Sequence, residues 1–318
     1  MDCKPADIRL DQIAADDHFF RISCAPDIEA LVKSIDYCGL LNPPMVIDRE
    51  GRLAVVSGFG RLAAADRLGW KTIRVRILNP DTSFENCARI AIIDNSSQRL
   101  LNTCEHVRAV QLLSRLVSEP ERLALAARSC GLPVDRKVIA DLLKAAQLPK
   151  SLEPGLITGA IALPTAVRLA EMQNLTASEM IGNLLIELDV SLNRQREIVD
   201  WIEAIARREA CGIRDIFESD ALVCLRKDAE SDRRQKAAQI RHYLRSRRFP
   251  AITSAERRFA SLRANMDLPA SVQLIAPPGF ESRSYTLQMH VTAVRDLSTF
   301  QLALKRLETS PEFQSLWE

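Results

Sequence analysis

Residues 57–61, Ser-Gly-Phe-Gly-Arg, stand where a predicted strand runs directly into a predicted helix. The first N–H groups of a helix have no partner inside it, and the helix dipole is positive at that end, so such a junction binds anions well. Gly58 and Gly60 would let the backbone approach a phosphate, and the guanidinium of Arg61 would add a forked donor. The same residues would also suit a tightly packed strand–helix corner without a ligand, so both interpretations stay open.

A second group of polar residues, Asp94 to Arg99, follows directly on an apolar run at residues 90–93. Mg²⁺ is usually held by one or two carboxylates together with the phosphates of a substrate. Asp94 could therefore organise a magnesium ion, while Asn95 and Arg99 contact phosphate oxygens. The alternative is a helix C-terminus followed by a solvated turn, with no ligand.

Residues 123–147 have the pattern of a helix–turn–helix motif. One helix covers residues 123–129, a short turn around Gly131 follows, and a second helix begins near Val134 and runs to about residue 147. The second helix of such a motif enters the major groove of DNA, although a plain antiparallel helix pair has the same pattern. In this helix we expect Val138, Leu142 and Ala145 to face inward, and the basic side chains of Arg136, Lys137 and Lys144 to face out toward DNA.

A basic stretch at residues 226–263 carries twelve Lys or Arg against four Asp or Glu. Within it, Arg245, Arg247 and Arg248 lie close together, and no acidic residue occurs between positions 232 and 256 to neutralise them. Such a cluster would contact DNA phosphates independently of sequence and in a salt-dependent manner. A solvated helix face is the other interpretation.

The elements around the first two groups indicate an α+β domain. We predict a helix over residues 26–38, a hairpin of strands at 44–48 and 52–57, a helix over 61–68 and a strand over 72–77. Gly39 and Gly69 directly follow the two helices, as glycine does at helix C-termini. The glycine-containing junction then lies between the second strand of the hairpin and the second helix.

From residue 80 to about 265 the pattern is helical, with a long helix over 192–210. Helix N-termini are predicted at Thr103, at Thr176 with Glu179 and at Thr253 with Glu256. Two strands, at 271–275 and 285–291, then precede a helix capped by Ser298. We expect Leu287, Met289 and Val291 to line a sheet that faces a second copy of the chain.

We predict four parts from these patterns: an N-terminal domain at 1–100, a helical DNA-binding domain at 101–215, a basic helical linker at 216–265 and a small α+β module at 266–318.

Of the 318 residues, 47% are hydrophobic and 26% are charged, which excludes wholesale disorder, and the 11 glycines favour helix over turn-rich β structure. The net charge of +2 points to no partner. No apolar run approaches the ~20 residues that span a bilayer, and the N-terminus lacks a signal-peptide core, so we expect a cytoplasmic protein with no membrane partner. The eight cysteines and four histidines show no metal-binding spacing, so we expect reduced thiols used as small apolar residues.

Taken together, the motifs resemble the ParB/RepB/Noc family of DNA-partition proteins. The stretch from Ile13 to Val46, with Ser34-Ile35 and Gly39-Leu40, is similar to the start of the family's N-terminal domain. Residues 58–69 resemble its first nucleotide motif, a Gly-Glu-Arg-Arg box, and Asp94-Asn95 with Arg99 and Glu105 resembles its second, a Glu-Asn-x-x-Arg box. The helix–turn–helix and residues 149–172 are similar to its central DNA-binding domain, so the resemblance covers about residues 6–175.

The resemblance implies an α+β N-terminal domain of the ParB/sulfiredoxin-like fold and then an all-α helix–turn–helix domain; the small α+β C-terminal module has no match in it. The family binds CTP with Mg²⁺, and its dimer closes as a sliding clamp on DNA. Carried over, Gly58, Gly60 and Arg61 would hold phosphates, Asn95 and Arg99 would contact the triphosphate, and Asp94 would lie near the metal. DNA, a second copy of the chain and a partner ATPase are the implied partners, and CTP hydrolysis is the candidate activity.

The sequence departs from the family pattern in three places. Phe59 and Gly60 replace the usual Glu or His and the first Arg, Ala63 stands where another Arg often occurs, and an ungapped alignment puts Gln98 at the Arg of the second box. Each replacement removes a charge-assisted phosphate contact worth ~1.5–3 kcal/mol. Two functions therefore stay open: a ParB-like protein of DNA partition or site-specific regulation that is gated by CTP, and a DNA-binding transcription regulator or adaptor that has lost nucleotide binding.

Overall fold

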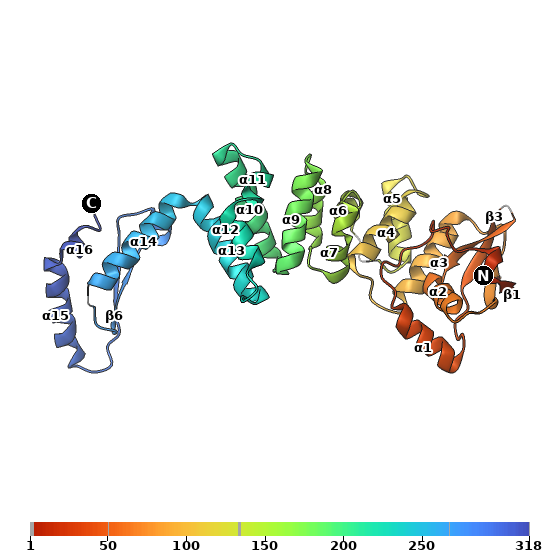
Figure 1. The fold of residues 1–318 in the computed structure, drawn as a ribbon, viewed down its shortest axis with the longest axis horizontal. Coiled ribbons are helices and arrows are strands. Elements are labelled where there is room, and N and C mark those ends of the chain that lie inside the picture. Colours follow the sequence, from red (N-terminus) through yellow and green to blue (C-terminus); the bar gives the residue numbers. More distant parts are fainter. Residues whose placement is uncertain (1–2, 50, 133–134, 267, 318) are drawn as a thin grey trace. The chain divides into compact units, whose positions relative to one another are not determined.

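The computed structural model describes residues 3–49, 51–132, 135–266 and 268–317 (Figure 1). The chain divides into two compact units, residues 1–199 and 200–318, and the boundary falls inside one long helix. The predicted fold class is confirmed: a mixed α/β domain comes first, a long helical region follows, and a small module of two strands and helices ends the chain.

A five-stranded mixed sheet forms the centre of the N-terminal domain, with strand order β1-β5-β3-β4-β2. The predicted hairpin is present as an antiparallel pair of β3 and β4, and β5 lies parallel to β3 and antiparallel to β1. Apolar side chains of the sheet, among them Val46, Val55 and Val75, are almost fully buried and form the core with Leu62. The strands are β1 (Cys3–Arg9), β2 (Ile13–Ala14), β3 (Met45–Arg49), β4 (Arg52–Ser57) and β5 (Thr72–Leu78), and a 3-10 turn, η1 (Leu10–Gln12), joins the first two.

Three helices flank the sheet: α1 (Ile28–Cys38), α2 (Phe59–Arg67) and α3 (Phe84–Ser96). Helix α1 packs on α2, and α3 packs on β4. Helix α2 begins two residues earlier than predicted, because Gly58 adopts a left-handed conformation, with φ of 93°, and ends β4 abruptly. A Cβ at Gly58 would lie 2.9 Å from the Cα of Pro44, so this turn requires glycine.

The helical region of the first unit has its N-termini at residues other than those predicted. Asn102, not Thr103, caps α4, and together with Glu105 it forms a full capping box. Asn174 replaces Thr176 as the cap of α9. The elements of this region are α4 (Thr103–Ser114), α5 (Pro120–Ser129), α6 (Arg136–Ala145), η2 (Lys150–Leu152), α7 (Glu153–Thr158), α8 (Leu163–Ala170), α9 (Leu175–Leu188) and α10 (Leu192–Glu209), which crosses the boundary between the units.

The second unit contains the rest of α10, four helices and the C-terminal module. Thr253 lies inside α14 and Ser298 lies inside α15, so the predictions that they cap helices are wrong. Helix α14 begins at Pro250, whose fixed φ suits the first turn of a helix. The elements are α11 (Ile213–Phe217), α12 (Asp220–Lys227), α13 (Arg233–Arg248), α14 (Pro250–Asn265), β6 (Val272–Ile275), η3 (Pro278–Phe280), β7 (Thr286–Met289), α15 (Asp296–Thr309) and α16 (Pro311–Gln314).

The two strands of the C-terminal module pack on the module's own helices. Leu287 and Met289 contact the cluster that Phe300 and Ala303 of α15 form with β6. These two side chains are half-buried against the module's own helix; that the sheet faces a second copy of the chain stays a prediction. Val291 lies beyond the end of β7 and is exposed.

Candidate functional site

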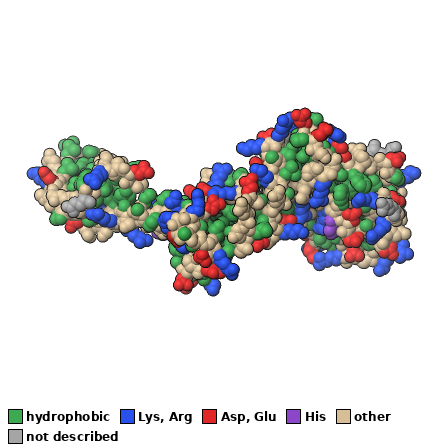
Figure 2. Space-filling view, turned by 90° about the horizontal axis from the view of Figure 1, so that it is seen from above, with side chains coloured by type: hydrophobic (Ala, Val, Ile, Leu, Met, Phe, Trp, Pro, Cys, Tyr) green, Lys and Arg blue, Asp and Glu red, His purple; other side chains and the backbone are tan. Residues whose placement is uncertain are grey.

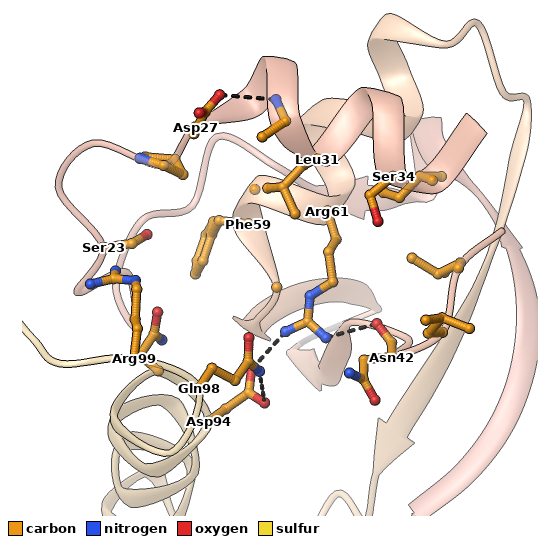
Figure 3. Close-up of a pocket in the computed structure, with 18 of the residues that line it drawn as sticks. Ser23, Asp27, Leu31, Ser34, Asn42, Phe59, Arg61, Asp94, Gln98 and Arg99 are labelled. Atoms are coloured by element: carbon orange, nitrogen blue, oxygen red, sulfur yellow. Dashed lines mark hydrogen bonds and ion pairs between the residues drawn. The ribbon is translucent and has the colours of Figure 1, made fainter. Parts of the chain in front are cut away.

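A pocket of about 510 Å³ lies in the N-terminal domain, bordered by α1, the start of α2 and the end of α3 (Figure 3). A volume of 300–1,000 Å³ is usual for a small-molecule site. The pocket brings together all the residues that the sequence assigns to nucleotide and metal binding, although they come from two separate motifs: Gly58, Gly60, Arg61, Asp94, Asn95 and Arg99.

The guanidinium of Arg61 points into this pocket (Figure 3). Its Nη2 donates to Oδ2 of Asp94 at 2.7 Å, and its Nη1 donates to the carbonyl oxygen of Asn42 at 2.7 Å. The side chain of Arg61 is only 14% exposed, so these two contacts fix its position. Gly60 lies behind it, where a Cβ would come within 2.9 Å of Leu31 on α1, so this glycine permits the close packing of α1 on α2.

The carboxylate of Asp94 accepts three hydrogen bonds in this part of the pocket. It accepts from the hydroxyl of Ser57 at 2.7 Å, from Arg61, and from Nε2 of Gln98 at 3.0 Å. An ionised carboxylate offers about four lone-pair sites, so these three donors leave room for about one further partner. Asp94 positions Arg61, and the spare site is where a cation could bind.

Asn95 and Arg99 lie on the other side of the pocket. Nδ2 of Asn95 donates to the carbonyl of Ala91, one turn back in α3, at 2.8 Å. Arg99 makes a two-pronged ion pair with Glu105, with N–O distances of 2.6 and 2.5 Å. Arg99 is 46% exposed, whereas the carboxylate of Glu105 is almost completely buried.

Glu105 anchors Arg99 and also joins two chain segments. Besides Arg99 it accepts the backbone N–H groups of Asn102, at 3.1 Å, and Cys24, at 3.2 Å. Burial raises the pKa of Glu105, but the hydrogen bonds from Arg99, Asn102 and Cys24 outweigh burial and leave its pKa below the ordinary value. The sequence points to Glu105 only within the second motif of the resemblance; its hydrogen bonds with Arg99 and with the backbone of Cys24 have no signal in the sequence.

Apolar side chains complete the pocket. Leu31, Ile35 and Leu40 line it from α1 and the following turn, and Phe59 lines it from the start of α2. Figure 3 shows Phe59 between Arg61 and the side of the pocket formed by Ser23 and Arg99. The site therefore combines an apolar wall, two arginines and a helix N-terminus, a set of groups that suits an organic molecule carrying an anionic group.

The helix pair of the predicted helix–turn–helix is present as α5 and α6, and α6 packs against α4 and α8. The predicted positions 133 and 134 lie outside the described residues. Leu142 and Ala145 are buried, as predicted, and Ile139 is the third buried residue of α6. Val138, the third residue predicted to face inward, is only half-buried, because it lies beside that stripe and Ile139 takes the buried position.

The basic side chains predicted for this helix all lie on its exposed side. Nη2 of Arg136 pairs with Glu121 on α5 at 2.8 Å, and Nζ of Lys144 pairs with Glu171 at 2.7 Å. Both pairs are highly exposed, and exposed pairs contribute ~1 kcal/mol or less, so DNA phosphate could displace the carboxylates.

The arginines of the basic stretch are paired, contrary to prediction. Arg245 makes a two-pronged contact with Glu256, and Arg247 makes one with Glu209. Arg248 lies over the ring of Phe249. The prediction that no acid neutralises this cluster is wrong because the acids come from α10 and α14. Figure 2 shows acidic and basic side chains mixed on the face that it draws.

Within residues 3–49, 51–132, 135–266 and 268–317, no three His, Cys, Asp or Glu side chains gather in a way that could hold a metal ion. No helix there is both long and apolar enough to cross a membrane. Of the carboxylates that line the pocket, Asp27 caps α1, which leaves Asp94 as the candidate ligand for a cation.

Comparison with known proteins identifies the domain that holds the pocket. Residues 6–96 match the ParB N-terminal domain. The nucleoid occlusion protein of Bacillus thuringiensis is 26% identical over 186 residues, which cover 58% of this chain and 62% of that protein. The chain therefore carries a ParB N-terminal domain and is a distant homologue of the Noc nucleoid occlusion proteins.

Two solved structures of C-terminally truncated ParB from Caulobacter crescentus are also similar to this chain, each at 22% identity. One, a complex with CTP-gamma-S, covers 58% of this chain and 99% of that chain with a TM-score of 0.27. The other, a complex with the centromeric parS site, covers 64% of this chain and 99% of that chain with a TM-score of 0.35.

Proposed function

We propose that this protein is a DNA-binding protein of DNA segregation or nucleoid occlusion, and that it binds CTP with Mg²⁺ in the pocket of its N-terminal domain. The observation that carries the nucleotide part is the meeting of Gly58, Arg61, Asp94 and Arg99 around one cavity. The CTP part rests in addition on the resemblance of these two motifs to the nucleotide boxes of the ParB family. DNA binding rests on the exposed basic side of α6 and on the Noc relatives.

The residues of the pocket fit a nucleoside triphosphate with one cation. Phosphates would lie at the N-terminus of α2, where Arg61 supplies a forked donor and the first backbone N–H groups of the helix have no partner inside it. Asp94 would contribute one ligand to Mg²⁺, which commonly takes one or two carboxylates and completes its shell with phosphates and water. Phe59 and Leu31 would cover the apolar part of the nucleoside.

Titration calorimetry of the full chain with CTP, ATP and GTP, with and without Mg²⁺ and DNA, tests the nucleotide site. We expect CTP to bind more tightly than ATP and GTP, and Arg61→Ala to weaken CTP binding at least about tenfold, because a charge-assisted contact is worth ~1.5–3 kcal/mol. Arg67→Ala is the matched control: Arg67 lies on the same helix but pairs with Glu29 at an exposed position.

The competing function is that of an adaptor that has kept the domain and lost the nucleotide. It is favoured by Phe59 and Ala63, which stand at positions where the family places charged side chains. Absence of binding by any triphosphate at millimolar concentration would support it. A phosphate-release assay on the same samples separates binding of CTP from its hydrolysis.

DNA recognition is tested on α6. After a preferred duplex has been selected from a random library, Lys137→Ala should reduce the ratio of specific to random binding about tenfold, because a base contact is worth ~1–3 kcal/mol. Lys33→Ala, which removes one exposed charge from α1, should leave the ratio unchanged. An equal loss on both duplexes would make Lys137 a phosphate contact.

The chain is further proposed to act as a dimer and to work with a partner ATPase, as the family resemblance implies. Sedimentation of the full chain with and without CTP and DNA measures the first part directly. A single monomeric species at micromolar concentration in all four conditions would contradict it.

A further inference from the structure

Two cysteine thiols meet beside the pocket. Sγ of Cys24 lies 2.8 Å from Sγ of Cys104, although 80 residues separate them in the chain. Cys24 belongs to the loop between β2 and α1, directly after the pocket residue Ser23, and Cys104 is the second residue of α4. Cys24 is partly exposed, whereas Cys104 is only 2% exposed.

The surroundings of this pair favour a thiolate on Cys104. Helix N-termini stabilise negative charge, and Cys104 lies in the first turn of α4 with Arg108 one turn further on. The hydrogen bond from Cys24 lowers the pKa of Cys104, and Arg108 adds to this against the opposing effect of burial. The same hydrogen bond raises the pKa of Cys24. When the pair has lost its first proton, the two sulfurs therefore share the proton that remains.

We propose that Cys24 and Cys104 form a redox site that hydroperoxides oxidise to a disulfide. The Cys104 thiolate takes the proton of Cys24, and the more exposed Cys24 sulfur attacks one oxygen of hydrogen peroxide. The O–O bond breaks, Cys24 becomes a sulfenic acid, and the hydroxide that leaves takes up a proton from solvent and becomes water. Cys104 then attacks Sγ of Cys24, the S–O bond breaks, and the hydroxyl leaves as a second water with the proton of Cys104.

In total two thiols lose two electrons to one hydroperoxide, which is reduced to water. A disulfide bond is ~2.03–2.05 Å long, so the sulfurs need to approach by less than about 1 Å. The partly exposed Cys24 is placed to meet the oxidant, and the buried Cys104 is placed to resolve the intermediate before further oxidation.

The disulfide would join the rim of the pocket to the helix that anchors Arg99. Loop residues 23–27 line the pocket through Ser23, Pro26 and Asp27. In the reduced protein this loop is held to α4 by the hydrogen bond from the Cys24 N–H to Glu105. Oxidation would add a covalent tie at the same place, and the loop would open less often.

Peptide mapping of the full chain tests the proposal. The reduced protein is treated with hydrogen peroxide, alkylated and digested without a reductant. We expect a cross-linked peptide that contains Cys24 and Cys104, which dithiothreitol cleaves and which forms at least about tenfold faster in the folded chain than in urea, because only the fold holds the sulfurs together. Hydrogen exchange of residues 22–27 should slow in the oxidised sample.

Cys24→Ser should abolish this cross-link, and Cys38→Ser, at an exposed position, should leave it intact. Persistence of both thiols at a peroxide dose that oxidises Cys38 and Cys224 would overturn the proposal, as would equal rates in the folded and unfolded chain. Peptide mapping of the wild-type protein tests for the Cys24–Cys104 cross-link even if a variant fails to fold. No nucleotide is present, so the outcome is independent of the proposed CTP site.

Discussion

Glu105→Gln is a substitution from which the structure predicts a large loss of stability beside the pocket. The change keeps the shape of the side chain but removes the charge that holds Arg99 and turns one oxygen into a donor group. Glu105 accepts hydrogen bonds from Arg99 and from the backbone N–H groups of Asn102 and Cys24, and it lies almost fully buried. A glutamine amide can keep only part of these contacts.

The expected loss is about 2–3 kcal/mol. Breaking a fully buried ion pair costs ~3–5 kcal/mol, and loss of a helix cap costs ~0.5–2 kcal/mol. The first figure must be reduced because Arg99 is 46% exposed and regains water when it is released. The second is reduced because Asn102 keeps its own side-chain contact with the N–H of Glu105, at 3.0 Å.

Native-state hydrogen exchange in increasing urea measures this loss locally, from peptides that cover α4. Glu121→Gln is the control, because Glu121 also pairs with an arginine but is highly exposed, and its loss should stay below about 0.5 kcal/mol. A cost for Glu105→Gln no larger than that of the control would refute the idea that this carboxylate joins the two segments.

The effect also depends on pH, with a defined sign. The folded pKa of Glu105 is below its unfolded value, because the hydrogen bonds from Arg99 and two N–H groups outweigh burial. Its stabilisation is therefore complete above the unfolded pKa, about 4.3, and is lost as the pH falls through the lower folded pKa. The difference between the wild type and Glu105→Gln should shrink below about pH 4; a difference that grows in acid would contradict this assignment.

Two further predictions concern the turn before α2 and the basic stretch. Gly58→Ala should destabilise the N-terminal domain by about 1–3 kcal/mol, because it combines a left-handed φ with a close contact between the new Cβ and Pro44. Thermal unfolding would measure this loss. Gly51→Ala is the control and should lose less stability, because Gly51 is also left-handed but has no atom near the position of a Cβ. Replacing Arg245, Arg247 and Arg248 together by Ser should change the slope of log K against log salt for DNA binding by well under about 2.7, which is the change expected for three unpaired phosphate contacts. The change should be smaller because glutamates already neutralise two of the arginines. A change of the full size would show that these arginines leave the glutamates for DNA phosphate.

The sequence predicts β3, β4 and β5 of the N-terminal sheet well because their signals are local, but it does not predict β1 or β2. Apolar runs rich in Val and Ile place β3 and β4 to within a residue, and the turn between them is short. The helix starts are less well predicted where two capping residues compete. Asn174 outranks Thr176 as an N-cap, and Pro250 opens α14 ahead of Thr253, in accordance with the preferences of these residues for the first helical positions.

The residues of the pocket were identifiable from their motifs, but the partners of their charges were not. Arg61 finds Asp94 33 residues away, and Arg247 finds Glu209 38 residues away. Such pairs follow no periodicity, because they depend on which helix ends the tertiary fold brings together. The error on the basic stretch has the same cause: a search for acids along the chain cannot detect acids on another helix.

In the proposed nucleotide site, the carboxylate of Asp94 competes with a phosphate for Arg61, because the two side chains form an ion pair. A phosphate that binds Arg61 must displace a carboxylate at 2.7 Å in a half-buried setting, so part of its binding energy is lost to that exchange. In the proposed function, a divalent cation in the pocket would give Asp94 a new partner, because Asp94 lines the same pocket as Arg61. Release of Arg61 to a phosphate and capture of a cation by Asp94 would then favour each other. The same pocket without Mg²⁺ should therefore bind a triphosphate weakly even though every residue needed for contact is already in place.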